Sequence, residues 1–163
     1  QVDWGDAAAF AFPVGWLFGR TGCFVVHDHP GRVTDFFLAV ADYEVGAPPY
    51  LPRHDLGLYE VFWCIGIIAT FFWLARKPRV PGFYIALLPI SYAPIRFALD
   101  YLRAGPEEGG DIRYFGFTPG QYGAVLILGL GLALLQWIRT HEPEPMPDWA
   151  KPDAEPTPAA KKA

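Results

Sequence analysis

Charge is scarce in this sequence, and in its long apolar runs it is nearly absent. Asp, Glu, Lys and Arg make up 18% of the 163 residues, whereas hydrophobic residues make up 52% and aromatic residues 17%. The runs FWCIGIIATFFWLA and YGAVLILGLGLALLQWI have no polar face that could meet water. This lack argues against helices in the core of a soluble bundle and favours helices that face lipid.

Cysteine and net positive charge are also lacking. The two cysteines, Cys23 and Cys64, are too few for a disulfide framework, and we expect two unpaired thiols in or near the membrane. The net charge of −4 argues against a nucleic-acid partner, which would require a basic face. The chain also has neither an initial methionine nor a signal peptide, so we expect a fragment of a longer membrane protein.

Metal-binding spacings such as H-x-x-E-H and H-E-x-x-H are missing too. Residues of metal-ligand type do gather where two of the apolar runs end, at His27, Asp28, His29, His54 and Asp55. Without a recognisable spacing, the sequence predicts no metal site and no cofactor.

Four apolar stretches have about the 20 residues that a helix needs to cross roughly 30 Å of hydrocarbon. We predict an all-α integral membrane protein, a bundle of about four transmembrane helices with a small extracytoplasmic loop segment, as part of a larger multi-span protein. The expected spans are about 7–26, 57–75, 82–101 and 119–138, within a membrane domain of residues 1–139. Residues 140–163, rich in Pro, Ala, Glu and Lys, are expected to be a disordered cytoplasmic tail.

The turn RKPRV between the second and third spans contains three basic residues and no acid. Short basic loops stay in the cytoplasm, so this turn predicts that residues 27–56 and 102–118 lie outside. In the first of these loops, FFLAVADYEV and APPYLPRH are predicted to form a short strand pair.

Two arginines, Arg20 and Arg96, fall inside expected spans, where a charge costs at least about 2.5 kcal/mol. At 1.5 Å per residue, each lies about 20 Å from the inner end of its span, at the depth of an outer-leaflet phosphate. Arg96 belongs to a polar stripe with Tyr92, Asp100 and Arg103 on one helix face. The stripe has two interpretations: internal pairing of Asp100 with Arg96, or an anion site, which the excess of arginine favours.

Neighbouring residues also have alternative interpretations. Gly15, Gly19 and Gly22 share nearly one helix face and are expected to let another backbone approach closely. Tyr59 is either a site residue or an interfacial anchor, and Glu60 is either a site residue or a solvated ion-pair partner of Arg53.

Several motifs, in their order and spacing, resemble the C-terminal part of the prolipoprotein diacylglyceryl transferase family. GRTGCF, Asp28 and Gly31-Arg32 are similar to the family's G-R-x-G-N-F, acidic residue and Gly-Arg, and HDLGLYE resembles its H-P-S-Q-L-Y-E. The stripe from Tyr92 to Arg103 is similar to Y-x-x-x-R-x-x-x-E-x-x-R, and RKPR and Gly120-Gln121 also match. The sequence departs from the family at Cys23, where asparagine is usual, and at Asp28 and Asp100, where glutamate is usual. Earlier spans of the family, including a histidine-bearing region, are not found here.

The resemblance implies transfer of a diacylglyceryl group from phosphatidylglycerol to the lipobox cysteine thiol of a prelipoprotein, at the outer leaflet of the bacterial inner membrane. The implied partners are phosphatidylglycerol, the lipobox segment and membrane lipid. The alternatives are a non-catalytic phospholipid-binding membrane paralogue and a metal-dependent hydrolase at the outer face.

The residues of the implied site fall into two groups. Arginines would hold phosphate, acids would orient them, tyrosines would donate hydrogen bonds, and a histidine would act as local acid or base. The expected catalytic residues are Arg20, Asp28, Arg96, Asp100, Tyr92 and His54. The expected substrate-binding residues are Gly19, Gly22, Cys23, Gly31, Tyr59, Glu60 and Arg103.

Overall fold

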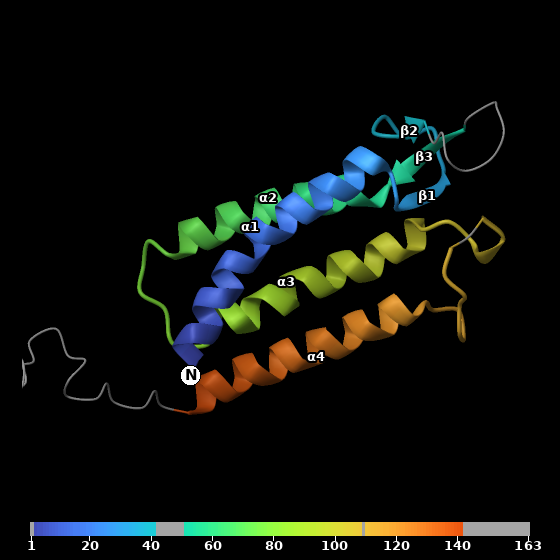
Figure 1. Cartoon of the computed structure of the whole chain (residues 1–163). Helices are drawn as coiled ribbons and strands as arrows, with labels where there is room; N and C mark the ends of the chain where they lie inside the picture. The colour runs from blue at the N-terminus through green and yellow to red at the C-terminus, as the bar shows by residue number, and fades with distance from the viewer. Residues whose placement is uncertain (1, 42–50, 109, 142–163) are drawn as a thin grey trace, which may run out of the picture.

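Four long helices form a bundle in the computed structural model, which describes residues 2–41, 51–108 and 110–141. The helices are α1 (Val2–Val26), α2 (Leu56–Leu74), α3 (Phe83–Leu99) and α4 (Pro119–Thr140). All four are long and apolar enough to cross a membrane. Helix α1 packs beside α2 and α3 beside α4, and α1 also contacts α3 (Figure 1). The predicted all-α membrane fold is confirmed.

Helix α1 begins at Val2, five residues before the expected start of the first span. Its first turns include Asp6, whose carboxylate accepts hydrogen bonds from the backbone N–H groups of Gly82, Tyr84 and Ile85 at 2.7 to 2.9 Å. These donors lie at the N-terminus of α3, where a helix leaves its first N–H groups without internal partners. Asp6 therefore ties the start of α1 to the start of α3.

Prolines interrupt two of the helices without ending them. Pro13 lies inside α1, which bends in its first half (Figure 1), as expected where a proline removes a backbone hydrogen bond. Helix α3 continues past Pro89 and Pro94 to Leu99, and a 3-10 turn, η1 (Asp100–Leu102), follows it. Helix α4 ends at Thr140, and the predicted tail from residue 142 onward lies outside the described residues.

A small sheet lies at one end of the bundle, which we call the strand end (Figure 1). Its strands β1 (Pro30–Val33), β2 (Val40–Ala41) and β3 (Pro52–Asp55) are antiparallel in the order β1-β3-β2. The pairing of β2 with β3 confirms the predicted strand pair, whose middle, residues 42–50, lies outside the described residues. Asp55 ends β3 and caps α2 by accepting a hydrogen bond from the Leu58 N–H, so the sheet is fixed directly to α2.

The close helix approach expected at Gly15, Gly19 and Gly22 is wrong for the described residues. A Cβ added at any of these positions would meet no described atom within 4 Å. The glycine that lets α1 and α2 approach is Gly57 of α2, where a Cβ would lie 3.0 Å from the Phe24 nitrogen. The glycine face of α1 is therefore directed away from the other helices.

Candidate active site

A buried carboxylate lies between α1, α2 and α3. Glu60 of α2 is only 2% exposed, and its Oε2 lies 2.7 Å from Nε of Arg20 on α1. The same oxygen accepts hydrogen bonds from Trp16 Nε1 at 3.2 Å and from the Tyr92 hydroxyl of α3 at 3.4 Å. The Arg20 guanidinium also lies over the Trp16 ring, 4.7 Å from its centroid. We call these four residues the Glu60 centre.

A second buried carboxylate lies where α3 ends and α4 begins. Asp100 is fully buried, and its Oδ1 lies 2.7 Å from Arg96 Nη1 and 3.8 Å from Arg103 Nη1. The Thr118 hydroxyl donates a hydrogen bond to the other oxygen, Oδ2. The predicted pairing of Arg96 with Asp100 is therefore present, and we call these four residues the Asp100 centre.

The first turn of α4 is fitted around Asp100. A Cβ at Gly120 would lie 2.5 Å from Asp100 Oδ2 and 2.9 Å from Arg96 Nη2, so only glycine leaves room for the ion pair. The next residue, Gln121, is buried, donates its side-chain N–H to the Phe97 carbonyl at 3.2 Å and completes a capping box with Thr118. The Gly120-Gln121 pair thus holds α4 against the Arg96 region.

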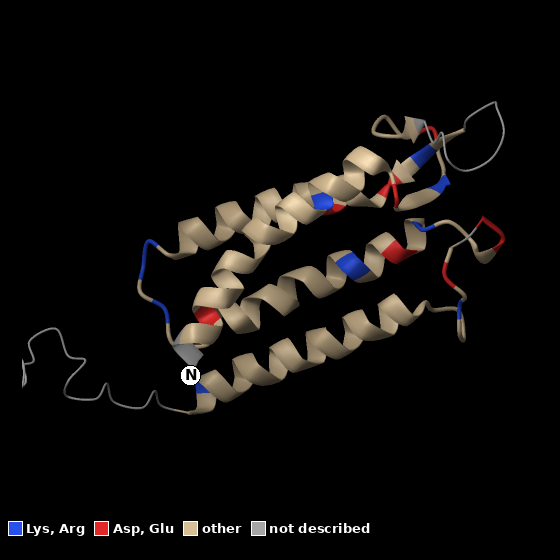
Figure 2. Ribbon diagram, in the orientation of Figure 1, with Lys and Arg blue, Asp and Glu red and all other residues tan. Residues whose placement is uncertain are grey.

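The two centres meet at α3, where Tyr92 and Arg96 are one turn apart. The Tyr92 phenol lies close enough to both Arg20 and Arg96 to interact electrostatically with each guanidinium. In Figure 2 the charged residues on the helices lie mainly in the half toward the strands, apart from the acidic start of α1 and the basic last turn of α4. Arg20 and Arg96, which belong to separate helices, are therefore both within electrostatic range of one tyrosine.

Each centre keeps some hydrogen-bonding capacity. Arg20 Nε and Asp100 Oδ1 are buried and ion-paired, yet neither makes an aligned hydrogen bond to any part of the chain that the structure describes. A buried polar atom without a hydrogen bond is costly unless a further group satisfies it. Arg20 is one of the two arginines that the sequence places at the depth of a lipid phosphate, and Asp100 is the ion-pair partner of the other, Arg96.

Above the Asp100 centre, strand β1 packs directly on the end of α3. Gly31 forms a β-bridge with Arg103, and Arg32 Nε donates to the Arg103 carbonyl at 3.3 Å. A Cβ at Gly31 would lie 2.6 Å from the Leu102 carbonyl oxygen, so this approach requires glycine. The Arg103 side chain lies between Asp100 and Asp111, 3.2 Å from the latter. Gly31 and Arg103, both expected site residues, are thus brought together.

The histidines at the strand end have separate partners. His27 Nδ1 lies 2.7 Å from Asp55 Oδ2, and His54 Nδ1 lies 2.6 Å from the Tyr59 hydroxyl. Partial burial lowers the pKa of His54, because removal from water disfavours the charged imidazolium. His54 is therefore neutral at pH 7, with its ring held by Tyr59.

Arg53 pairs with Glu108 and not with Glu60. Its two terminal nitrogens lie 2.9 Å from the two Glu108 oxygens, and Nη1 also donates to the Gly31 carbonyl at 3.0 Å. These hydrogen bonds lower the pKa of Glu108. The alternative in which Glu60 is a solvated partner of Arg53 is wrong, because Glu60 is only 2% exposed and pairs with Arg20 of α1.

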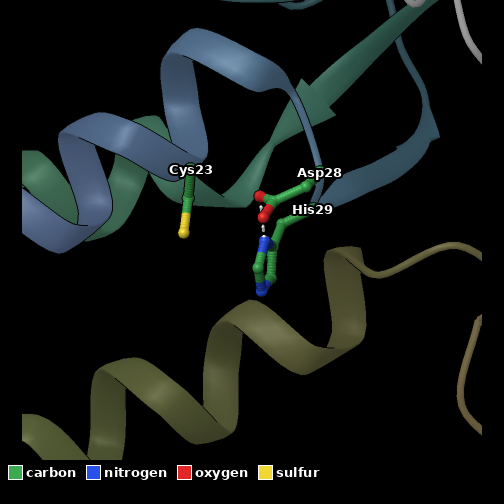
Figure 3. Close-up of side chains that lie close together, drawn as sticks. All are labelled: Cys23, Asp28 and His29. Atoms are coloured by element: carbon green, nitrogen blue, oxygen red, sulfur yellow. Dashed lines mark hydrogen bonds and ion pairs between the residues drawn. The ribbon is translucent and has the colours of Figure 1, made fainter.

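Cys23, Asp28 and His29 lie together where α1 ends (Figure 3). Asp28 forms an ion pair with His29, and this hydrogen bond lowers the pKa of the Asp28 carboxyl. The Arg20 Nη1 group lies 3.9 Å from the Cys23 sulfur. Both cysteines are free thiols, as the sequence predicts.

Two residues of the centres were not predicted from the sequence. Trp16 precedes Arg20 by four residues, a helical spacing that places both side chains on one face of α1. Thr118 opens the sequence TPGQ, which has the T-x-x-Q pattern of a capping box. Both signals were present but local, and neither indicates which buried carboxylate the residue contacts.

Comparison with known proteins identifies the family. The family model of prolipoprotein diacylglyceryl transferase matches residues 1–137. The chain belongs to this family. Two relatives, both named phosphatidylglycerol–prolipoprotein diacylglyceryl transferase, are 32% identical over 130 residues in Chlorobaculum tepidum and 33% identical over 136 residues in Chromohalobacter salexigens. These alignments cover 79% and 82% of this chain, and 44% and 49% of the relatives, so the chain spans about half the length of the curated relatives it matches.

Within this prolipoprotein diacylglyceryl transferase family member, the resembling motifs converge in space. GRTGCF places Arg20 in the Glu60 centre, and HDLGLYE contributes Glu60 itself. The third motif supplies Tyr92 to the Glu60 centre and Arg96 to the Asp100 centre. Motifs separated by tens of residues therefore build one continuous polar region across three helices.

Proposed function

We propose that this chain carries the phosphate-binding part of an enzyme that transfers a diacylglyceryl group from phosphatidylglycerol to the lipobox cysteine thiol of a prelipoprotein. The observation that carries the proposal is the pair of guanidinium groups, Arg20 and Arg96, on separate helices beside Tyr92. The names of the relatives support the reaction, and we place it at the outer leaflet of the bacterial inner membrane.

The arginines are held so that donors remain for a phosphate. Glu60 Oε2 lies 2.7 Å from Nε of Arg20, Arg20 Nη1 lies 3.9 Å from the Cys23 sulfur, and Asp100 Oδ1 lies 2.7 Å from Nη1 of Arg96. The remaining guanidinium N–H groups suit phosphate oxygens, which arginine binds in a planar, bidentate geometry. Gly19 precedes Arg20 by one residue and Gly22 follows it by two, both are exposed, and we propose that a lipid lies against this glycine face of α1.

The chemistry requires stabilisation of a leaving phosphate. The acceptor sulfur forms a bond to the glyceryl carbon as the bond from that carbon to the phosphate oxygen breaks, and the electron pair leaves with glycerol phosphate. Guanidinium groups already fixed by Glu60 and Asp100 stabilise this charge without reorganising. We assign the thiol proton to His54, an imidazole at the strand end whose Nδ1 lies 2.6 Å from the Tyr59 hydroxyl and whose lowered pKa favours the neutral, proton-accepting form.

The test is transfer of labelled diacylglyceryl from phosphatidylglycerol to a lipobox peptide by the full-length gene product that contains this chain, in proteoliposomes. We expect label on a cysteine peptide and none on its serine counterpart. Arg96→Lys should lower kcat about 100-fold, because it removes the planar donor pair from the leaving phosphate. Arg139→Lys, an exposed arginine in the last turn of α4, is the matched control and should leave turnover unchanged.

Two outcomes would reject the proposal. Wild-type protein that binds phosphatidylglycerol without labelling the peptide would indicate a non-catalytic phospholipid-binding protein. Equal turnover of Arg96→Lys and Arg139→Lys would show that the Asp100 centre takes no part in the reaction.

A further inference from the structure

We propose that Cys23, Asp28 and His29 form a binding site for a divalent cation of the zinc class. Their ligand atoms, a sulfur, a carboxylate oxygen and an imidazole nitrogen, all lie within 4.8 Å of one another. Figure 3 shows the three side chains facing a common space between the end of α1 and helix α3. The sequence did not group them, because Cys23 is not among the ligand-type residues at the ends of the apolar runs.

The donor set selects the class of metal. Thiolate, imidazole and carboxylate together suit zinc and chemically similar ions such as cobalt(II), whereas magnesium and calcium prefer oxygen ligands. Zinc holds nitrogen or oxygen at about 2.0 Å and sulfur at about 2.3 Å, so the side chains need to close by only a small rotation. The hydrogen bond between Asp28 and His29 would be exchanged for coordination of the ion.

The backbone holds the ligands in place before any ion arrives. His27 has a positive φ of 51°, which ends α1 and turns the chain back so that Asp28 and His29 return alongside Cys23. The His27 ring is paired with Asp55, and the Leu56 N–H donates to the His29 carbonyl at 3.3 Å. Because the turn is anchored on both sides, little ordering entropy remains to oppose metal binding.

The thiolate is the ligand that makes the site selective. An asparagine at position 23 would supply only a weak amide oxygen in place of it. Three protein ligands leave a fourth position for water or another ligand. The Cys23 sulfur lies 3.9 Å from Arg20 Nη1, so an ion bound here would lie beside the Glu60 centre.

The test is metal binding by the full chain, purified in detergent with any affinity tag removed. Cobalt(II) titration should produce a thiolate-to-cobalt charge-transfer band at one equivalent, and zinc should displace the cobalt. Cys23→Asn should abolish the band, and Cys23→Asn and His29→Gln should each weaken zinc affinity at least about 100-fold, since each removes a ligand. Cys64→Ala, which removes the other thiol deep in α2, should bind metal like the wild type.

The readout is independent of lipid transfer, so failure of the proposed reaction would not affect it. Circular dichroism and gel filtration of each variant separate loss of the site from loss of the fold, and His29→Gln provides a second variant outside the helix. The proposal is overturned if wild-type protein retains no zinc, or if a well-folded Cys23→Asn variant binds cobalt with the same spectrum and affinity.

Discussion

At the scale of single residues, two buried carboxylates organise the polar interior. A buried charge is tolerated only when it is paired and hydrogen-bonded, and both Glu60 and Asp100 meet this requirement. The side chain of Asp100 is one methylene shorter than that of a glutamate. Arg96 nevertheless reaches it at 2.7 Å and Thr118 donates to it, so the shorter side chain keeps its place in the site.

Adding a methyl group at Gly120, in the first turn of α4, should disrupt the ion pair between Asp100 and Arg96. In Gly120→Ala the new Cβ would fall 2.5 Å from Asp100 Oδ2 and 2.9 Å from Arg96 Nη2, so the ion pair must move. We expect the melting temperature to fall and the free energy of unfolding to decrease by about 1 to 3 kcal/mol. We also expect turnover to drop at least tenfold. Gly123→Ala is the matched control, because a Cβ there meets nothing within 4 Å of the described structure. Similar effects of the two substitutions would contradict the proposed fit of α4 around Asp100.

At the scale of elements, the Arg53–Glu108 ion pair fastens the short 3-10 turn η2 (Pro106–Glu108) to strand β3. The pKa of Glu108 is lowered in the folded state, so the pair stabilises the fold above the ordinary glutamate pKa of 4.5. This contribution is lost as pH falls through the lowered pKa. Glu108→Gln should therefore lower the melting temperature at pH 7, and the difference from wild type should shrink toward pH 3.

Thermal scans in detergent over this pH range measure the effect. Glu107→Gln removes the same charge one residue away and should give a smaller difference at pH 7. A Glu108→Gln difference that stayed constant from pH 7 to pH 3 would show that the carboxylate charge does not stabilise η2.

The helices could be predicted from the sequence because their signal is local, whereas much of the site depends on contacts between elements. Apolar length alone indicates four spans, and the i,i+4 spacing indicates the pair of Arg96 with Asp100. The partner of Glu60 could not be predicted, because Arg20 precedes it by 40 residues and lies on another helix. Strand β1 was missed for the same reason, since its partner β3 is distant in sequence and PGRV has no alternating pattern. The extension of α1 back to Val2 could not be predicted either, because Asp6 in its first turns accepts hydrogen bonds from the start of α3, which is distant in sequence.

At the scale of the whole molecule, the two ends of the bundle differ in charge and structure. The turn between α2 and α3 carries Arg76, Lys77 and Arg79 at the end opposite the strands, whereas the strand end combines acidic and basic residues (Figure 2). We expect the basic turn to lie in the cytoplasm and the strand end outside, because short loops rich in lysine and arginine are retained on the cytoplasmic side. This orientation would place the Glu60 centre and the Asp100 centre in the outer half of the membrane.

Cysteine labelling in intact cells tests this orientation. In a background with Cys23→Ser and Cys64→Ala, single cysteines are placed at two exposed positions, Asp35→Cys at the strand end and Lys77→Cys in the basic turn. A membrane-impermeant maleimide, given access to the outer face of the inner membrane, should label Asp35→Cys and leave Lys77→Cys unmodified until the membrane is permeabilised. The labelling of both positions after permeabilisation is the control for accessibility. The reverse pattern would place the Glu60 centre and the Asp100 centre in the cytoplasmic leaflet, where an acceptor peptide outside the membrane would not reach them.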